Sequence, residues 1–232
     1  MRSLQTAWYW FIRTFVRYCY FVLTGGFKVN GKENVPKTGP LIIAPNHESY
    51  LDPPAAGCAL PRILTFMAKE ELFRFKPMSI LIRSLGAFPV KRGTSDIESI
   101  RIALSILEEG KALLVFPEGT RNLGEQMMPM NRGVEMLAKR SGALIVPVGI
   151  TGTHTKWGKH KKLKLWGKVV IRFGEPLNYA EFADRKDEFA PELERRILAL
   201  CHESGFQLKS AAENQPSKKT ASDDASSATS HP

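Results

Sequence analysis

Short apolar runs alternate along this chain with segments in which apolar residues recur every three or four positions. The runs are continuous and rich in Val, Ile and Leu, as in strands that are buried on both faces. The periodic segments are bounded by capping residues, Gly or Pro, as in amphipathic helices. The expected strands are residues 27–29, 41–44, 63–67, 87–90, 112–116, 143–148 and 169–173, and the expected helices are residues 53–60, 77–85, 95–110, 133–140 and 191–200.

The alternation of strands with helices predicts an α/β fold: a single domain with a mostly parallel central sheet flanked by helices. We expect this domain to cover residues 27–206. From residue 207 to residue 232 the chain turns to Ser, Ala, Thr, Asp and Lys and has no Phe, Tyr or Trp. Such a composition buries too little apolar surface to order a chain, so we expect a disordered tail.

Residues 1–26 precede this domain and are dense in Trp, Tyr and Phe. Arg13 and Arg17 are four positions apart, so they share one face of the expected helix. They keep every uninterrupted apolar run below the roughly 20 residues that span a bilayer, and they do not fit a signal peptide. An aromatic helix with one cationic edge is typical of the membrane interface, where its rings lie among the headgroups. The alternative is a core helix that packs on the domain.

The formal net charge of +10 and a pI near 9.6 indicate an anionic partner. Charge alone leaves open nucleic acid, an anionic membrane surface and a phosphorylated substrate. Residues 156–168 contain six lysines and two tryptophans. This segment suits anionic lipid headgroups or nucleic acid equally well, and a solvated hairpin loop is the third interpretation.

The three cysteines form no C-x-x-C pair; they are Cys19, Cys58 and Cys201. Their isolation argues against a disulfide framework and against a zinc site, and it fits a reducing compartment. No group of His, Cys, Asp or Glu has the spacing of metal ligands. The sequence therefore predicts neither a metal nor a cofactor.

The segment from Pro45 to Asp52 carries the first candidate chemistry. Pro45 ends the expected strand and two prolines follow Asp52, so a helix is expected to begin there with Asp52 as its N-cap. On one helix His47 and Asp52 would lie about 140° apart, so only a turn lets them meet. If they meet, Asp52 fixes the imidazole tautomer and His47 can remove a proton from a hydroxyl. The alternative is that Asp52 only caps the helix and His47 is an ordinary polar residue.

Two other strand ends carry polar residues that can converge on the same crevice of the sheet. Arg92 stands beside a glycine, where a phosphate can approach the backbone and the guanidinium. Residues 117–121 offer a carboxylate, a glycine and a second arginine. No serine or cysteine is favoured as a nucleophile, and nothing pairs Cys58 with His47. The pattern therefore favours direct attack, in which His47 deprotonates a hydroxyl that attacks an activated carbonyl.

Four blocks of the sequence carry a resemblance to a known family. Residues 46–52 resemble the N-H-x4-D block of the glycerolipid acyltransferases, the family of 1-acylglycerol-3-phosphate (lysophosphatidic acid) acyltransferase. Residues 86–93, 116–121 and 146–150 are similar to the second, third and fourth blocks of that family. The blocks occur in the family's order, and the resemblance covers roughly residues 27–176.

The resemblance implies a role for each matching residue. His47 would be the base and Asp52 would orient it, while Arg92 would bind the phosphate of the acceptor. Glu118 and Gly119 would shape the acceptor site, with Arg121 as support. The residue implied for the acyl-donor region is Pro147.

The sequence departs from the family's pattern in two places. The family often has a serine where Asn122 stands here. It also has a Phe-Lys-x-Gly segment, whose lysine lies near the acceptor phosphate and corresponds to Asn131. Asn131 carries no charge, so the neighbouring Arg132 becomes the candidate for that contact.

The resemblance implies an acyltransferase of phospholipid biosynthesis. It would move a fatty acyl group from acyl-CoA or acyl carrier protein to the free hydroxyl of 1-acylglycerol-3-phosphate, forming phosphatidic acid. We expect a monotopic or peripheral protein on the cytoplasmic face of an anionic membrane, and nucleic acid is not the expected partner. The alternatives are another lysolipid acceptor, a non-catalytic basic protein that binds lipid or nucleic acid, and a hydrolase that uses Cys58 or water.

Overall fold

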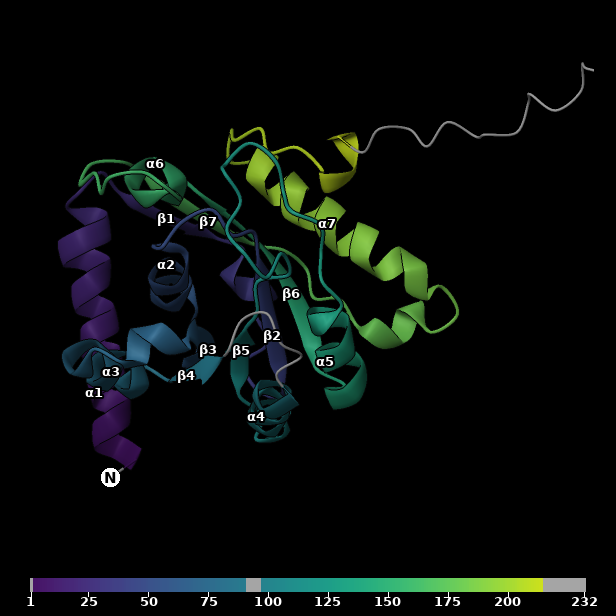
Figure 1. Ribbon diagram of the computed structural model, residues 1–232, viewed down its shortest axis with the longest axis horizontal. Helices are drawn as coiled ribbons and strands as arrows, with labels where there is room; N and C mark the ends of the chain where they lie inside the picture. The colour runs from purple at the N-terminus through teal and green to yellow at the C-terminus, as the bar shows by residue number, and fades with distance from the viewer. Residues whose placement is uncertain (1, 91–96, 215–232) are drawn as a thin grey trace, which may run out of the picture.

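A computed structural model describes residues 2–90 and 97–214 of the chain (Figure 1). Its centre is a seven-stranded sheet with the order β1-β7-β6-β2-β5-β3-β4. The five strands from β6 to β4 pair in parallel, β7 is antiparallel to β6, and β1 is parallel to β7. The strands are β1 Phe27–Asn30, β2 Leu41–Pro45, β3 Leu64–Lys69, β4 Ala87–Val90, β5 Ala112–Leu114, β6 Leu144–Thr151 and β7 Val169–Phe173. All seven expected strands and the mostly parallel sheet are confirmed.

Helices cover both faces of this sheet (Figure 1). On one face α4, α5 and α7 bury their apolar sides, and on the other face α2 and the N-terminal helix do the same. The helices are α1 Arg2–Phe15, α2 Asp52–Ala59, α3 Lys76–Ser84, α4 Ile97–Glu108, α5 Gly133–Ser141, α6 Thr153–Trp157 and α7 Lys186–His202. A π-helix, η1 Val16–Val22, continues α1, and the 3-10 turns are η2 Lys32–Asn34, η3 Glu70–Phe73, η4 Tyr179–Phe182 and η5 Ala211–Asn214.

The continuous apolar runs follow from this two-sided cover. In β2, Leu41 and Ile43 belong to the core under α2, while Ile42 and Ala44 belong to the core under α5 and α7. All four side chains are fully buried. Because both faces are covered, neither parity of the strand needs polar residues.

The elements α1 and η1 form one continuous N-terminal helix, which docks on the domain through Arg13 and Arg17. Arg13 Nε donates to the carbonyl of Gly57 at 3.1 Å, and Arg17 Nη1 donates to the carbonyl of Cys58 at 3.3 Å. These carbonyls lie in the last turn of α2, where they have no helical donor and carry the negative end of the helix dipole. The expected helix is confirmed, and Arg13 and Arg17 form one edge of it as expected, but this edge contacts α2. In the part of the chain that the structure describes, no helix is both long and apolar enough to cross a membrane.

One lysine of the segment 156–168 has a purely internal place. Lys156 is fully buried, and its ammonium donates to Thr24 O at 3.0 Å, Thr24 Oγ1 at 2.7 Å and Gly167 O at 3.3 Å, and also to Leu165 O. Lys156 thus joins the end of the N-terminal helix to the loop after α6. The expectation that this lysine binds headgroups or nucleic acid is wrong. Residues 161–166 of the same segment are exposed, and for them the expectation stays a prediction.

The ordered domain extends beyond its expected end at residue 206. Leu208 is buried in the core beside α7, and the backbone of Lys209 bonds to Glu125 and Met127, at 3.0 Å each. The predicted start of the disordered tail at residue 207 is therefore wrong. Residues 215–232 lie outside the described residues.

Replacing Lys156 by Met should destabilise the fold. Methionine keeps most of the side-chain volume but leaves several buried carbonyl oxygens without a donor, which costs on the order of 1–3 kcal/mol. We expect a thermal midpoint lower by several degrees in calorimetry. The matched control is Lys162→Met, at an exposed position of the same segment. Equal midpoints for the two variants would show that the buried ammonium contributes nothing to stability.

Candidate active site

The carboxyl ends of β2, β5 and β6 lie side by side at one edge of the sheet. The chain leaving β2 carries His47, the chain leaving β5 carries Glu118, and the chain leaving β6 carries Thr153. All three side chains are buried at this edge. Arg92 follows the end of β4 but lies outside the described residues, so its expected contact with the site stays a prediction.

His47 and Asp52 meet, because the turn between β2 and α2 folds the carboxylate back onto the imidazole. His47 Nδ1 and Asp52 Oδ2 are 2.9 Å apart. The backbone N–H groups of Glu48 and Ser49 also donate to Oδ2, both at 2.8 Å, and Thr153 Oγ1 donates to Oδ1 at 2.6 Å. Asp52 thus binds the imidazole, its own turn and the first residue of α6, directly after β6.

The predicted N-cap at Asp52 is wrong. The helix α2 begins at Asp52 itself, its N-cap position is Leu51, and no side chain caps it. The carboxylate points back to the amides of the preceding turn instead of forward to those of the helix. The carboxylate thus serves the turn and Thr153 and makes no hydrogen bond to the first amides of the helix.

The His47 imidazole is held from several directions. Its ring stacks on Phe116, with 3.7 Å between ring centroids and 20° between planes. Its backbone N–H donates to Glu118 Oε1 at 2.7 Å, and its carbonyl accepts from the N–H of Asn122 at 2.8 Å. The contact with Asp52 favours the tautomer that has its proton on Nδ1, which leaves the lone pair on Nε2. The ring is therefore arranged to act as a base at Nε2.

Glu118 positions this corner with both of its oxygens. Oε1 accepts from His47, and Oε2 accepts from Asn122 Nδ2 at 2.9 Å and from the N–H of Met128 at 2.7 Å. Burial raises the pKa of Glu118 to about 7, although these hydrogen bonds act in the opposite direction. The carboxylate expected to shape the acceptor site is thus engaged with the protein and fixes the backbone beside the base.

A further buried carboxyl group, that of Glu48, was not expected from the sequence. Asn46 Nδ2 donates to Glu48 Oε1 at 2.7 Å, and the same amide group bonds the backbone N–H and carbonyl of Ile150. Glu48 Oε2 is buried and has no hydrogen-bond partner among the described residues. Burial, followed by the charge of Asp52, raises the pKa of Glu48 to about 8. At neutral pH this group is therefore mostly protonated.

The remaining residues of the third block lie at the same edge. Arg121 Cζ lies 3.4 Å over the ring of Tyr50, which contacts Trp157 at 4.8 Å between ring centroids. Gly119 has a φ of 64°, in the left-handed region that favours glycine, and its Cα faces the amide of Asn131. The position where the family has a lysine therefore does lie against this corner. Arg132 is exposed at the start of α5.

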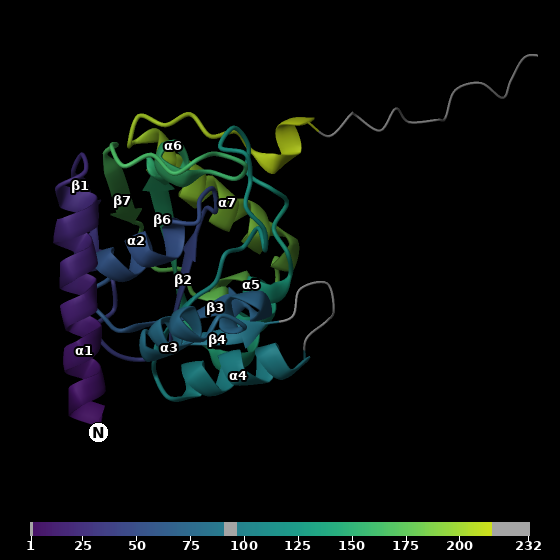
Figure 2. The same ribbon diagram turned by 60° about the vertical axis from the view of Figure 1, so that its left-hand side comes forward.

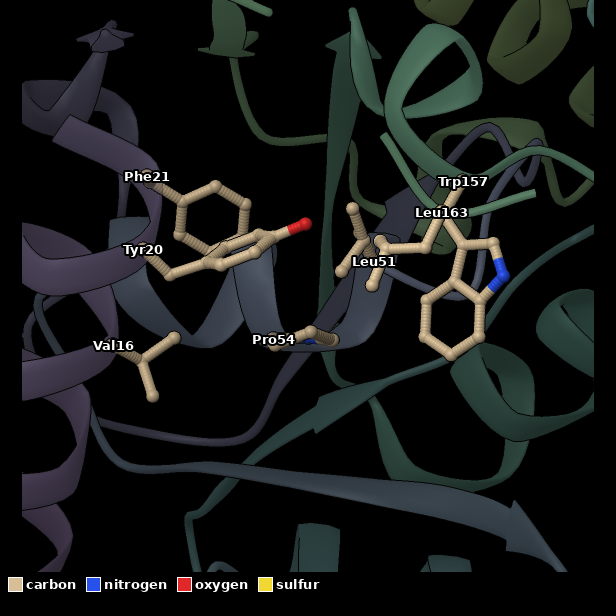
Figure 3. Close-up of a pocket in the computed structure, with 7 residues that line it drawn as sticks. All are labelled: Val16, Tyr20, Phe21, Leu51, Pro54, Trp157 and Leu163. Atoms are coloured by element: carbon tan, nitrogen blue, oxygen red, sulfur yellow. The ribbon is translucent and has the colours of Figure 1, made fainter. Parts of the chain in front are cut away.

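An apolar cavity of about 310 Å³ lies between the N-terminal helix and the start of α2 (Figure 3). The N-terminal helix forms one wall, the start of α2 forms the floor, and the end of α6 with the loop after it forms the opposite wall. Leu51, directly before Asp52, belongs to the lining, so the cavity reaches the catalytic turn. The lining residues are Val16, Tyr20, Phe21, Leu51, Pro54, Trp157 and Leu163.

Pro147 does not join this group. It lies within β6 opposite Ala44 and contacts Gly174. A separate cavity beside it is lined by residues of α7, on the face of the sheet opposite the apolar cavity. The expected link of Pro147 to the acyl donor stays a prediction.

Cys58 is unsuited to act as a nucleophile. Its thiol is buried and donates to the carbonyl of Arg13 at 3.5 Å, and burial raises its pKa to about 12. A nucleophilic cysteine needs a pKa lowered toward neutrality. Among the residues that the structure describes, no group of three His, Cys, Asp or Glu side chains is placed to hold a metal ion.

Several site residues were missed by the sequence analysis, notably Asn46, Glu48 and Thr153. The clue to Thr153 was its place just after a predicted parallel strand, at the edge where such folds keep their chemistry. Asn46 and Glu48 stood within the recognised turn, but nothing in the sequence showed that their side chains would point inward.

Known proteins are similar to this chain in sequence. The family model described as Acyltransferase matches residues 26–151. A protein of Bacillus subtilis (strain 168) named 1-acyl-sn-glycerol-3-phosphate acyltransferase is 35% identical over 184 residues, which are 77% of this chain and 89% of that protein. A protein of the same name from Streptococcus pneumoniae is 26% identical over 193 residues, which are 82% of this chain and 70% of that protein.

The fold matches a solved structure as well. The crystal structure of the 1-acyl-sn-glycerophosphate (LPA) acyltransferase PlsC from Thermotoga maritima matches with a TM-score of 0.78 and 26% identity, covering 88% of this chain and 82% of that chain. The family model spans more than half of the 232 residues and includes the His47–Asp52 turn. Together with the buried base and its carboxylate, these findings confirm the resemblance and show that the chain is an enzyme of the acyltransferase family.

Proposed function

We propose that this enzyme is a 1-acylglycerol-3-phosphate O-acyltransferase. It transfers a fatty acyl group from an acyl thioester, acyl-CoA or acyl carrier protein, to the free hydroxyl of the acceptor and forms phosphatidic acid. The observation that carries the proposal is the 2.9 Å contact between His47 and Asp52, in a turn whose Leu51 lines an apolar cavity. The names of the relatives and the matching blocks support this choice of acceptor.

The geometry supports a single-step transfer. His47 Nε2 takes the proton of the acceptor hydroxyl as its oxygen attacks the thioester carbonyl carbon. The new C–O bond forms, the C–S bond breaks, and the leaving thiolate takes the proton from His47. Asp52 stabilises the imidazolium that exists in between. No acyl-enzyme is needed, which agrees with the buried and engaged thiol of Cys58.

The apolar cavity suits the acyl chain of the donor. Its lining offers methyl, methylene and ring surface, and each buried CH₂ contributes about 0.8 kcal/mol. One wall belongs to the N-terminal helix, so a chain in the cavity lies against the segment that we propose to rest on the membrane. Membrane association, peripheral or monotopic and on the cytoplasmic face, brings the enzyme to its lipid acceptor and product.

The acceptor phosphate requires cations near the base. We assign this contact to Arg92, with Arg121 and Arg132 as further candidates, and the net charge of +10 favours an anionic substrate. Gly119 permits close approach of the backbone at the same corner.

Other functions explain less of the structure. A basic protein that binds lipid or nucleic acid without catalysis has no use for the buried His47–Asp52 pair, and Lys156 is withdrawn from any such surface. A hydrolase that acts through Cys58 is at odds with a pKa of about 12. A different lysolipid acceptor remains the alternative that Asn131 allows.

Replacing His47 by Ala should lower turnover by 10²–10⁴-fold, because the general base is lost. Thiol release is followed with lysophosphatidic acid in detergent, using acyl-CoA and acyl carrier protein thioesters in parallel; this also identifies the donor. The matched control is His160→Asn, since His160 is exposed at a φ of 62°, which asparagine tolerates. Near-normal turnover of the His47 variant would remove the proposed base.

Replacing Arg92 by Ala should mainly raise the KM for the acceptor and leave the KM for the thioester unchanged, because only the acceptor bears the recognised phosphate. Steady-state kinetics with each substrate varied in turn separates the two constants. Arg101→Ala, in an exposed ion pair with Glu98, serves as the control for lost positive charge. An unchanged acceptor KM would exclude Arg92 from the phosphate site.

The buried carboxyl of Glu48 should make stability depend on pH. Its pKa rises from about 4.5 in the unfolded chain to about 8 in the fold, so its stabilising effect is complete below pH 4.5 and is lost as the pH rises to 8. The thermal midpoint of the native protein should therefore fall more steeply between pH 5 and pH 9 than that of Glu48→Gln. For the free energy of unfolding, the slopes of the two proteins differ by at most about 1.4 kcal/mol per pH unit. Parallel curves would show that Glu48 ionises normally.

A further inference from the structure

We propose that η3 and α3 form a second membrane-binding element, which extends the apolar face of the N-terminal helix onto the acyltransferase domain. The occupant that we infer is the surface of an anionic phospholipid bilayer. The inference rests on the proposed function only in taking the enzyme to act on membrane lipids; its contacts are independent of the chemistry at His47.

The N-terminal helix presents one outward apolar stripe. Within α1 the stripe repeats at intervals of four and three residues, which keeps its members on one side of an α-helix. Exposed apolar residues continue from there into η1. All members of the stripe have large apolar side chains, and each of them is at least 38% exposed. Neither α1 nor η1 contains an acidic residue. The stripe consists of Leu4, Trp8, Phe11, Phe15, Tyr18 and Val22.

The elements η3 and α3 expose a comparable set of side chains. Ile80 is 72% exposed and Phe75 is 67% exposed, and Leu72, Met78 and Leu81 are 39–47% exposed. No side chain of α3 falls in the buried class. A soluble domain rarely leaves so many large apolar groups in one short segment, and such patches mark contact with a protein or a membrane.

The two apolar surfaces are continuous. Trp8 Nε1 donates to Ser84 Oγ at 3.0 Å, which joins the exposed side of α1 to the last turn of α3. Ile80 and Leu81 precede Ser84 by four and three positions, so they lie on the same side of α3 as the contact with Trp8. Figures 1 and 2 both show α3 beside α1. A surface that receives the stripe of α1 therefore meets α3 as well.

The charge around this surface favours anionic lipid over a second copy of the chain. Lys69, Arg74, Lys76 and Arg83 are exposed along η3 and α3, against Glu70 and Glu71 on the acidic side. Basic residues near the edge of an apolar patch attract anionic headgroups while the apolar groups enter the interface. A two-fold contact between copies would bring these cations toward their own equivalents.

The test measures binding of the full-length protein to vesicles without any substrate. Co-sedimentation with vesicles of phosphatidylcholine and phosphatidylglycerol gives a partition coefficient for the native protein and for Phe75→Ser/Ile80→Ser. We expect that coefficient to fall about tenfold or more, because two large apolar side chains no longer enter the interface. The matched control is Ile97→Ser, at a position that is 70% exposed but belongs to α4, and its coefficient should change less than twofold.

A charge variant provides the second, independent measurement. Arg74→Gln/Lys76→Gln should weaken binding to the anionic vesicles several-fold and leave binding to pure phosphatidylcholine vesicles nearly unchanged. Both positions are exposed, so thermal unfolding should match that of the native protein. Because no acyl transfer is measured, failure of the proposed reaction would not alter these results.

Three outcomes would overturn the inference. Vesicle binding by Phe75→Ser/Ile80→Ser could equal that of the native protein, or Ile97→Ser could lose as much binding. Alternatively, light scattering could show that the native protein is a dimer which Phe75→Ser/Ile80→Ser converts to a monomer, in which case the surface is an interface between copies.

Discussion

The site depends on the hydrogen bonds that the carboxylate of Asp52 accepts. Its two oxygens accept from the imidazole of His47, from two amides of the intervening turn and from the hydroxyl of Thr153. The first three bonds close the turn between β2 and α2, and the fourth ties that turn to the start of α6. The same group therefore shapes the corner and selects the tautomer of the base, so local structure and chemistry have one cause.

Around this carboxylate the protein buries two further carboxyl groups. Glu118 and Glu48 have raised pKa values because burial disfavours their charged forms, and the charge of Asp52 adds to the effect. Glu118 uses its oxygens to hold the backbone of His47 and the loop at Met128. Burial thus favours the neutral forms of Glu48 and Glu118 beside the carboxyl group that contacts the imidazole.

The N-terminal helix directs Arg13 and Arg17 toward the domain and leaves large apolar groups on its outer side. Arg13 and Arg17 bind the carbonyl end of α2, and Lys156 binds the end of η1 from the other side. With Arg13 and Arg17 directed to the domain, the helix has aromatic and aliphatic groups left for its outer face. The apolar cavity lies between these two attachments, so the helix serves as a wall of the cavity as well as an outer surface.

The sequence by itself determined the strands, most helices and the α/β class, because these depend on local periodicity. It offered the pairing of His47 with Asp52 as one of two interpretations, and the resemblance of the four blocks then favoured it. It did not determine the direction of charged side chains whose partners are distant in the sequence. The arginines of the N-terminal helix, Lys156 and Glu48 look like surface groups in the sequence, yet each finds its place only through partners or neighbours brought close by the fold. Thr153 reaches Asp52 across 101 residues, and Leu208 is buried only because α7 and the segment after it return to the core. Only the tertiary structure could decide these positions, since the free energy of burying a polar group depends on acceptors and donors that are distant in the chain.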